Sequence, residues 1–351
     1  MTSAATAGAV PDLDAPALSV RDLRVGYRTT RGPLWAVDGV SFDVHPGESL
    51  GLVGESGCGK SSLGRAIMRL MPPGGVVRGS VVVRGRDLVK APESELRRIR
   101  GEDVALVFQE PMTRLNPLMK VSDHFIEAIR AHRPDISKRE AHHMARAALA
   151  QMGIPPTRAD NYPHEFSGGM RQRIMIALGI VLRPRVIIAD EPTTALDVIV
   201  ESQILDILDR LRRDESVGLI LITHNLGIVA ETCDRVAVMY AGKIVEMGTT
   251  EQVFTSPKHP YTRGLLSSTI SLETTELHSI PGYPPDLVDP PPGCRFAPRC
   301  PFRMPHCTDK VPDYAEPEPG QLVACFCYPG AGLPVPPGAP DPTKVGPEVW
   351  Q

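Results

Sequence analysis

The chain contains the stretch Gly54-Glu55-Ser56-Gly57-Cys58-Gly59-Lys60-Ser61, which fits the phosphate-binding pattern G-x-x-x-x-G-K-[ST]. The apolar run at residues 49–53 precedes it as a buried strand would, and residues 62–70 follow with helical periodicity. Glycines let the backbone curl so that N–H groups point at phosphate oxygens, and the helix N-terminus adds its positive end. This strand, turn and helix predict a site for the phosphates of a nucleotide.

The side chains of this stretch have expected roles. Lys60 is expected to reach the β- and γ-phosphates, and the Ser61 hydroxyl is expected to ligate Mg²⁺. A glycine-rich turn that binds nothing is the alternative interpretation. The residues predicted to bind the nucleotide are Gly54, Ser56, Gly57, Cys58, Gly59, Lys60, Ser61 and Ser62, with Cys58 serving only as a small residue.

Apolar runs that end on polar residues recur after this stretch. Gln109, Asp190 and His224 each end or follow such a run, and helical patterns lie between the runs. Strands that alternate with helices predict an α/β fold with a largely parallel sheet covered on both faces. Because ligand groups gather at the C-terminal ends of parallel strands, we expect these side chains to lie near the phosphates.

Two adjacent carboxylates end one of these runs. Asp190 after four apolar residues matches the Walker B pattern and is expected to hold Mg²⁺, while Glu191 is placed to polarise a water for attack on the γ-phosphate. The alternative is a helix cap, because Pro192 and two threonines follow. His224 is expected to sense or orient the γ-phosphate, or else to cap a strand. Tyr27, at a strand end, could stack on a base or pack on its neighbours.

Composition restricts the class of protein. The chain has 351 residues, enough for about two domains, with 42% apolar and 23% charged residues, as in soluble globular proteins. A formal net charge of −3 argues against a general nucleic-acid binder. No apolar stretch approaches the roughly 18 residues that span a bilayer, and residues 1–16 lack the positive region of a signal peptide. We therefore expect a cytosolic protein.

A further stretch carries a family resemblance. Ser167-Gly168-Gly169-Met170-Arg171-Gln172-Arg173 resembles the signature sequence of ATP-binding-cassette (ABC) proteins. The order of motifs over roughly residues 17–330 is also similar: Tyr27, Walker A, Gln109, signature, Walker B with Glu191, the D-loop Ala195-Leu196-Asp197, and His224. The resemblance implies a head-to-tail pair of cassettes, in which Ser167, Gly168 and Gly169 contact a nucleotide held mainly by the partner chain. It also implies that Gln109 binds Mg²⁺ and reports γ-phosphate occupancy to transmembrane subunits.

Other stretches resemble the D-type ATPase subunits of dipeptide and oligopeptide importers. They are Phe108-Gln109-Glu110-Pro111-Met112 through Asn116-Pro117, Tyr162-Pro163-His164-Glu165-Phe166, Ala189-Asp190-Glu191-Pro192-Thr193-Thr194-Ala195-Leu196-Asp197, His259-Pro260-Tyr261-Thr262, Ile280-Pro281-Gly282 and Gly293-Cys294-Arg295-Phe296. Met170 departs from the Gln of many cassettes, but D-type subunits resemble this variant. Lys60, Gln109, Glu191 and His224 would then be the catalytic residues.

The resemblance implies partners and a place of action. The chain is expected to hydrolyse ATP at the cytoplasmic face of the cell membrane and to power peptide uptake. Its implied partners are a second ATPase subunit, for which family practice favours a paralogue, two transmembrane permease subunits and an extracytoplasmic peptide-binding protein, with no nucleic acid. The alternatives are an importer ATPase for another solute such as nickel or glycosides, a soluble non-transport ABC ATPase, and a cassette that binds ATP without hydrolysing it.

The expected domains follow from the motifs and from a change in composition. We expect a flexible leader at 1–16 and an ABC nucleotide-binding domain at 17–246, with a P-loop NTPase (RecA-like) core, an antiparallel β subdomain and an inserted helical subdomain at about 93–180. Of 36 prolines, 21 fall from Met247 onward, and proline disfavours regular helix and central sheet. A small Pro- and Cys-rich module at 247–330 and a disordered tail at 331–351 are therefore expected.

Five cysteines are clustered in that module. In a cytosolic protein such a cluster favours metal binding over disulfides, and the spacing lacks the tight pairs of structural zinc sites. Related peptide-importer subunits carry iron–sulfur clusters, so we predict a [4Fe–4S] cluster, with zinc, unliganded thiols or a disulfide as alternatives. The predicted ligands are Cys294, Cys300, Cys307 and Cys325, with Cys327 able to replace Cys325, and the nearby cations Arg295, Arg299, Arg303 and Lys310 would stabilise the thiolates.

Overall fold

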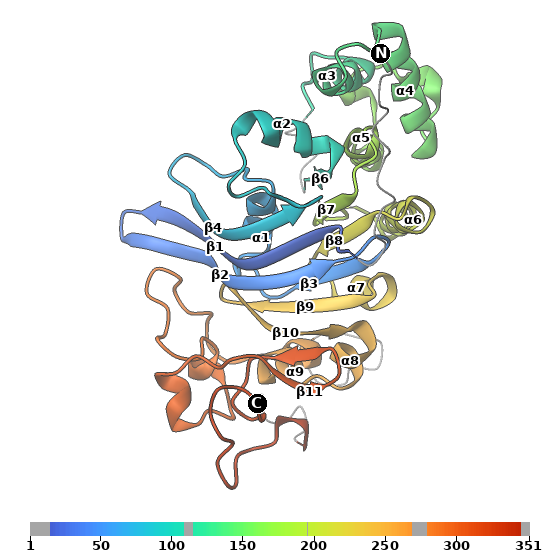
Figure 1. The fold of residues 1–351 in the computed structure, drawn as a ribbon. Coiled ribbons are helices and arrows are strands. Elements are labelled where there is room, and N and C mark those ends of the chain that lie inside the picture. Colours follow the sequence, from blue (N-terminus) through green and yellow to red (C-terminus); the bar gives the residue numbers. More distant parts are fainter. Residues whose placement is uncertain (1–14, 109–114, 195, 269–278, 345–351) are drawn as a thin grey trace, which may run out of the picture.

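Strands and helices alternate along the chain and form two sheets, as Figure 1 shows. The computed structural model describes residues 15–108, 115–194, 196–268 and 279–344. Within these ranges the α-helices are α1 (Lys60–Ile67), α2 (Glu93–Glu102), α3 (Val121–His132), α4 (Lys138–Gln151), α5 (Gly168–Ile180), α6 (Val198–Glu215), α7 (Leu226–Thr232), α8 (Thr250–Thr255) and α9 (Pro260–Ser267). Short 3₁₀ turns lie at Pro156–Arg158, Pro163–Glu165, Ala297–Arg299, Pro305–Thr308 and Pro342–Lys344.

The smaller sheet is antiparallel and has the order β2-β1-β4-β5. Its strands are β1 (Leu18–Thr29), β2 (Gly32–Val44), β4 (Val76–Val83) and β5 (Arg86–Asp87). Helix α1 joins this sheet to the larger one, because Leu63 and Ile67 are buried in one cluster with Val25 of β1 and Leu52 of β3. The turn that begins α1 is thereby held between the two sheets.

The larger sheet has the order β11-β12-β10-β9-β3-β8-β7-β6 among the described residues. Its strands are β3 (Ser49–Val53), β6 (Val104–Val107), β7 (Val186–Asp190), β8 (Gly218–Ile222), β9 (Arg235–Tyr240), β10 (Lys243–Thr249), β11 (Ala315–Glu318) and β12 (Gln321–Val323). From β9 to β6 every neighbouring pair is parallel. Every residue of β3, β7 and β8 is buried, which explains their apolar sequences and confirms the predicted parallel core.

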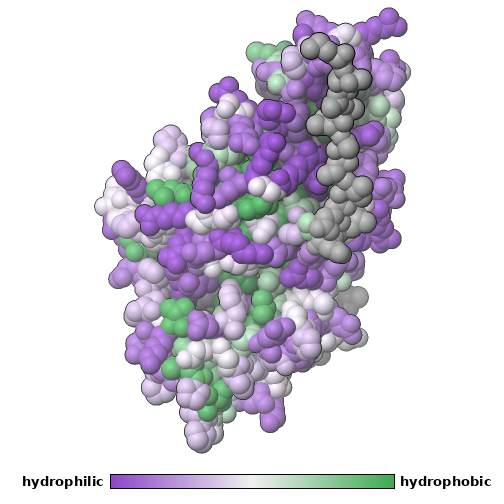
Figure 2. All heavy atoms as spheres, viewed as in Figure 1, coloured by the Kyte–Doolittle hydropathy of each residue, from purple (hydrophilic) through white to green (hydrophobic). Residues whose placement is uncertain are grey.

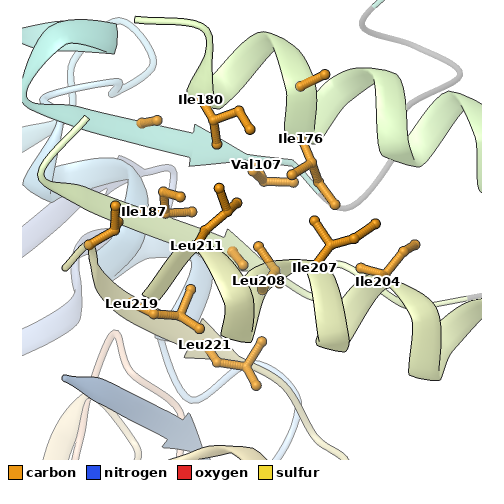
Figure 3. Packing of buried hydrophobic residues seen from close by; sticks show 14 of the residues in the cluster. Val107, Ile176, Ile180, Ile187, Ile204, Ile207, Leu208, Leu211, Leu219 and Leu221 are labelled. Carbon is orange, nitrogen blue, oxygen red and sulfur yellow. The ribbon is translucent and has the colours of Figure 1, made fainter. Parts of the chain in front are cut away.

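Helices α5 and α6 cover one face of this sheet through a single apolar layer. Figure 3 shows the contact, in which α6 contributes Ile204, Ile207, Leu208 and Leu211, strands β7 and β8 contribute Ile187, Leu219 and Leu221, and α5 and β6 contribute Ile176, Ile180 and Val107. The four α6 residues recur at helical spacing and therefore share one face of the helix. This packing fixes the ends of β7 and β8, where polar side chains follow.

A helical region lies between β6 and β7. Phe125 and Ile129 of α3 are buried with Ala141, Ala145 and Leu149 of α4, and the small alanines let the two helices approach closely. Strand β6 also falls within the span 93–180 that was expected to form the inserted subdomain, yet it pairs with β7 in the larger sheet. Helices α3 and α4 lie away from the sheets in Figure 1.

The C-terminal part extends the larger sheet with two strands that were not predicted from the sequence. Strand β12 pairs with β10, and β11 pairs with β12, all antiparallel. The fully buried carboxylate of Glu246 in β10 accepts hydrogen bonds from the backbone N–H groups of Lys258 (2.7 Å) and His259 (2.8 Å) and from the amide of Gln321 (2.8 Å). One buried side chain therefore links the sheet, the start of α9 and the C-terminal hairpin.

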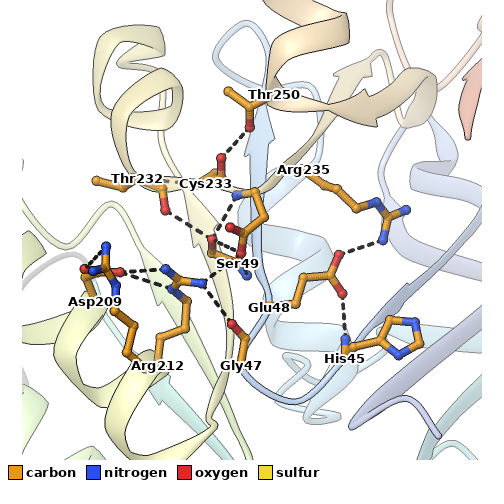
Figure 4. Close-up of polar contacts among 12 residues, drawn as sticks. His45, Gly47, Glu48, Ser49, Asp209, Arg212, Thr232, Cys233, Arg235 and Thr250 are labelled. Atoms are coloured by element: carbon orange, nitrogen blue, oxygen red, sulfur yellow. Dashed lines mark hydrogen bonds and ion pairs between the residues drawn. The ribbon is translucent and has the colours of Figure 1, made fainter. Parts of the chain in front are cut away.

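The starts of β3 and β9 are joined by polar contacts that Figure 4 displays. The Ser49 N–H donates to the Asp234 carboxylate (2.8 Å), and the Asp234 N–H donates back to the Ser49 hydroxyl (2.9 Å). Arg212, near the end of α6, donates to Asp234 (3.0 Å) and to the Gly47 carbonyl (2.9 Å). These bonds satisfy the buried Ser49 and fix the end of the sheet opposite the glycine-rich turn.

The viewed surface is mostly hydrophilic, with hydrophobic residues in small separate groups (Figure 2). In the part of the chain that the structure describes, no helix is both long enough and apolar enough to cross a lipid bilayer.

Candidate nucleotide-binding site

A cavity of about 640 Å³ opens at the glycine-rich turn between β3 and α1. Its polar lining includes Ser56, Lys60 and Ser61 from the turn and the start of α1, together with Glu191 and His224 from beyond the ends of β7 and β8. Gly57, Gly59 and Ser62 also line it. The structure thus brings these predicted residues together at the C-terminal edge of the parallel strands, where ligand-binding groups were expected.

The turn has a conformation that only glycine tolerates at two positions. Gly54 has φ +147°, and a Cβ there would lie 2.0 Å from the Met239 carbonyl oxygen. Gly59 has φ +109°, and its Cβ would lie 2.1 Å from the Ala36 carbonyl oxygen. The Lys60 ammonium donates to the carbonyls of Gly54 (2.7 Å) and Glu55 (3.1 Å). The turn therefore curls around the ammonium group that is expected to meet phosphate.

The Walker B carboxylate lies beside the first helix. The Ser61 hydroxyl donates to Asp190 Oδ1 (2.9 Å), and Asp190 is only 3% exposed. Burial raises the pKa of the Asp190 carboxyl, while the hydrogen bond from Ser61 opposes that shift. A hydroxyl and a carboxylate side by side are oxygen ligands of the kind that Mg²⁺ prefers, so these two residues fit the predicted metal.

Glu191 and His224 form a contact at the cavity. Glu191 Oε1 lies 3.2 Å from His224 Nδ1, and Glu191 Oε2 accepts a hydrogen bond from the Thr194 hydroxyl (2.8 Å). Glu191 has φ +48°, a left-handed conformation that is uncommon for this residue type, and its N–H donates to the Ile222 carbonyl (2.8 Å). The backbone therefore holds this carboxylate at the cavity rather than at a helix cap, and His224 stays 65% exposed beside it.

An apolar group lines the same cavity. Tyr27, half-buried at the end of β1, donates its hydroxyl to Ser62 (3.0 Å), and Leu34 and Ala36 of β2 lie in the lining with it. The sequence motifs did not predict that Leu34 and Ala36 line the cavity. These two residues alternate along a strand and belong to no motif. Leu287, from the Pro-rich C-terminal part, also lines the cavity and was missed for the same reason.

Other predicted residues do not line this cavity. Cys58 is buried with its sulfur 3.7 Å from the Lys60 ammonium. Ser167 caps α5 by accepting from the Met170 N–H (3.4 Å), and Ser167 and Gly168 are exposed away from the cavity lining. Gly169 follows in the first turn of α5. Gln109 lies outside the described residues, as does Ala195 of the D-loop.

The cysteines of the C-terminal part do not form a metal site. Cys294, Cys300, Cys307, Cys325 and Cys327 all lie in described segments and are free thiols. Among the described residues, no group of three or more His, Cys, Asp or Glu side chains could hold a metal ion. The predicted [4Fe–4S] cluster on Cys294, Cys300, Cys307 and Cys325 is therefore wrong, and zinc in its place has no more support.

Burial gives the physical reason for this correction. Burial raises the pKa of the Cys294 thiol to about 11 and raises the pKa of Cys300 as well, whereas a metal ligand must be a thiolate. Two of the four cations expected to stabilise thiolates are bound to carboxylates instead. Arg295 donates to the Asp38 carboxylate (2.6 Å), and Arg299 donates to the carboxylate of Glu55 (2.9 Å). Cys294 and Cys300 therefore pack against the apolar core as neutral thiols.

Comparisons with known proteins agree with this fold. A sequence model of the ABC transporter family matches residues 37–194, and a model described as the oligopeptide/dipeptide transporter C-terminal region matches residues 245–307. A solved dimeric structure of a bacterial ABC transporter cassette is similar with a TM-score of 0.59 and 25% identity, over 66% of this chain and 98% of that one. The structure of cbiO1 from Clostridium perfringens, part of an ABC transporter complex, gives a TM-score of 0.57 and 27% identity, over 69% of this chain and 91% of that one.

Sequence relatives resolve the family further. The chain is 47% identical to the dipeptide transport ATP-binding protein DppD of Bacillus subtilis, over 88% of this chain and 94% of that protein. It is 44% identical to the oligopeptide transport ATP-binding protein OppD of Salmonella typhimurium, over 93% of this chain and 98% of that protein. Fold and cavity together define an ABC-type ATPase. The chain belongs to the dipeptide and oligopeptide transport ATP-binding proteins of the ABC transporter family. The predicted family, fold class and enzyme class are thereby confirmed.

Proposed function

We propose that this chain hydrolyses ATP at the cytoplasmic face of a cell membrane and powers the import of dipeptides or oligopeptides. The observation that carries the proposal is the full-length similarity to DppD and OppD, which are named as dipeptide and oligopeptide transport ATP-binding proteins. The match to the C-terminal region of oligopeptide and dipeptide transporters supports the same cargo class.

The predicted residues that the structure brings to this site then have chemical roles. Lys60 and the backbone of the glycine-rich turn bind the β- and γ-phosphates, and Ser61 and Asp190 hold Mg²⁺. Bound Mg²⁺ neutralises part of the phosphate charge. Glu191 accepts the proton of the attacking water, and the contact with His224 holds its carboxylate toward the cavity. Tyr27 supplies an aromatic face for the base.

The site is completed by a second cassette in this proposal. The exposed Ser167 and Gly168, together with Gly169, would reach the nucleotide of a partner chain, because they do not line the cavity of their own chain. The similar bacterial cassette forms a dimer, which supports this arrangement. We infer a paralogous cassette, two transmembrane permease subunits and an extracytoplasmic peptide-binding protein as the other components.

Transport by the assembled complex tests the proposal. The chain, its second cassette, the permease pair and the binding protein are reconstituted in proteoliposomes, with ATP on the side of the cassettes. We expect ATP-dependent uptake of a labelled dipeptide or oligopeptide, and no uptake when this chain carries Glu191→Gln. Uptake of nickel or of a glycoside in place of either peptide would refute the proposed cargo class.

A further inference from the structure

The C-terminal part of the chain reaches the nucleotide cavity through one segment, residues 280–288, which we call the Leu287 segment. Leu287 is half-buried and lines the cavity together with Tyr27, Leu34 and Ala36. Its side chain also packs against the main apolar core, as does that of Ile280 at the other end of the segment. An apolar side chain thus meets the cavity at the side formed by β1 and β2.

The end of the segment next to Leu287 is anchored to the hairpin that carries Tyr27. Arg31, in the turn between β1 and β2, forms an ion pair with Asp286. The second oxygen of Asp286 accepts a hydrogen bond from the Val288 N–H (3.0 Å), which closes a tight turn around Leu287. One contact with the β1–β2 hairpin, at Asp286, and one turn within the segment therefore define the position of Leu287.

The other end of the segment is anchored to the glycine-rich turn. Arg299, whose side chain is 6% exposed, donates to the carbonyls of Ile280 (3.1 Å) and Pro281 (2.9 Å). The same guanidinium donates to both carboxylate oxygens of Glu55 in the turn (2.9 and 3.1 Å). A two-pronged Arg–carboxylate contact is geometrically specific. The segment and the phosphate-binding turn are thus held by one buried side chain.

We propose that Leu287 contacts the base of the bound nucleotide and forms an apolar wall of the base site with Tyr27, Leu34 and Ala36. Polar side chains of the lining gather around the glycine-rich turn and the strand ends: Ser56, Lys60, Ser61, Ser62, Glu191 and His224. The apolar group is therefore the part of the cavity suited to a planar heterocycle. This inference rests on the proposed ATPase function. It makes ATP binding depend on the C-terminal part of the chain, beyond the phosphate contacts of the cassette motifs.

The test compares two ligands that share phosphates but differ in the base. Binding of MgATP and of inorganic tripolyphosphate with Mg²⁺ to the full chain is measured by calorimetry. We expect Leu287→Ala to raise the Kd for MgATP about ten-fold, because an apolar contact in the pocket is lost, and to leave the Kd for tripolyphosphate unchanged. Leu287→Met, which keeps the side-chain volume, should bind MgATP almost as the wild type does.

A matched control comes from the same segment. Tyr283 is 92% exposed, so Tyr283→Ala should change neither Kd. Unchanged MgATP binding by Leu287→Ala would overturn the inference, and so would an equal rise in the Kd for both ligands. Either result would leave the proposed ATPase function intact. A wild-type chain that binds neither ligand would instead overturn the proposed function, and this inference with it.

Discussion

The Ser61 hydroxyl donates a hydrogen bond to Asp190 although the two residues lie 129 positions apart in the chain. The sheet makes this contact, because β3 and β7 both flank β8 and end at the same edge. The sheet therefore brings the end of β3 close to Asp190, and the glycine-rich turn and α1 then place the Ser61 hydroxyl beside that carboxylate. Pre-organised ligands lower the cost of binding, so Mg²⁺ should meet a site that is already formed.

Removing the charge of Asp190 should weaken binding of Mg²⁺ specifically. Asp190→Asn keeps an acceptor for the Ser61 hydroxyl but loses the negative charge, and we expect the affinity for Mg²⁺ in the presence of ATP to fall about 10- to 100-fold. Titration of Mg²⁺ into the chain with bound ATP measures this loss. Asp123→Asn, on an exposed face of α3, is the control. Equal Mg²⁺ affinity in the two variants would contradict the assignment.

The Glu191 carboxylate should be needed for hydrolysis and dispensable for binding. Glu191→Gln keeps the shape of the side chain but cannot accept a proton, so we expect ATPase turnover to fall at least about 100-fold. The Kd for MgATP should stay within a few-fold of the wild-type value. Turnover is measured by phosphate release from the assembled complex. Wild-type turnover in this variant would exclude Glu191 as the base.

The glycine-rich turn should not tolerate a methyl group at Gly59. A Cβ there would lie 2.1 Å from the Ala36 carbonyl, and φ is +109°, so Gly59→Ala must displace backbone. We expect a rise of about 5- to 150-fold in the Kd for MgATP, which corresponds to the roughly 1–3 kcal/mol of such strain. Gly85→Ala is the control. Gly85 has φ +72° but no atom within 4 Å of an added Cβ, so this variant has the backbone strain without the steric clash. Similar MgATP binding by both variants would contradict the steric argument.

His259 should make stability depend on acid pH. Burial lowers its pKa to about 3, and its Nδ1 accepts a hydrogen bond from the Tyr261 N–H (3.0 Å) at the start of α9. The folded state holds this ring neutral, whereas the unfolded chain protonates it below the ordinary pKa of 6.5. The contribution of His259 to the free energy of unfolding is therefore complete above pH 6.5 and is lost as the pH falls toward 3. The slope is up to about 1.4 kcal/mol per pH unit.

Urea unfolding at several pH values between 4 and 7 measures this slope. His259→Asn keeps an acceptor for the Tyr261 N–H and removes the titration, so its free energy of unfolding should vary less with pH than that of the wild type. Parallel curves for the two proteins would show that His259 is not the titrating group.

The sequence was sufficient to predict the glycine-rich turn and the strand-end residues of the site, but not the apolar contact from Leu287. Buried parallel strands are continuous apolar runs, so the positions of Asp190 and His224 at strand ends could be inferred from pattern alone. The conformation of Gly54 and Gly59 requires glycine, which is why that motif is recognisable. Leu287 has no such signal, since it belongs to an irregular segment whose position depends on contacts with Arg31 and Arg299.

The thiols and the last strands show two further limits of sequence reading. Cysteine spacing suggested ligands, but it carries no information on burial, and burial keeps Cys294 protonated. Strand β11 contains a proline and strand β12 has only three residues, so neither shows a recognisable alternation of apolar and polar residues. Their pairing with β10 depends on long-range contacts such as that of Gln321 with Glu246.

That contact also has a consequence for how the protein is made. Gln321 follows Glu246 by 75 residues, so the ribosome releases β10 well before the strand that covers its edge. An uncovered strand edge offers free N–H and C=O groups to other chains. The ribosome must therefore release the chain as far as β12 before this sheet can close, and a nascent chain stalled between β10 and β12 would expose the edge of β10 to aggregation.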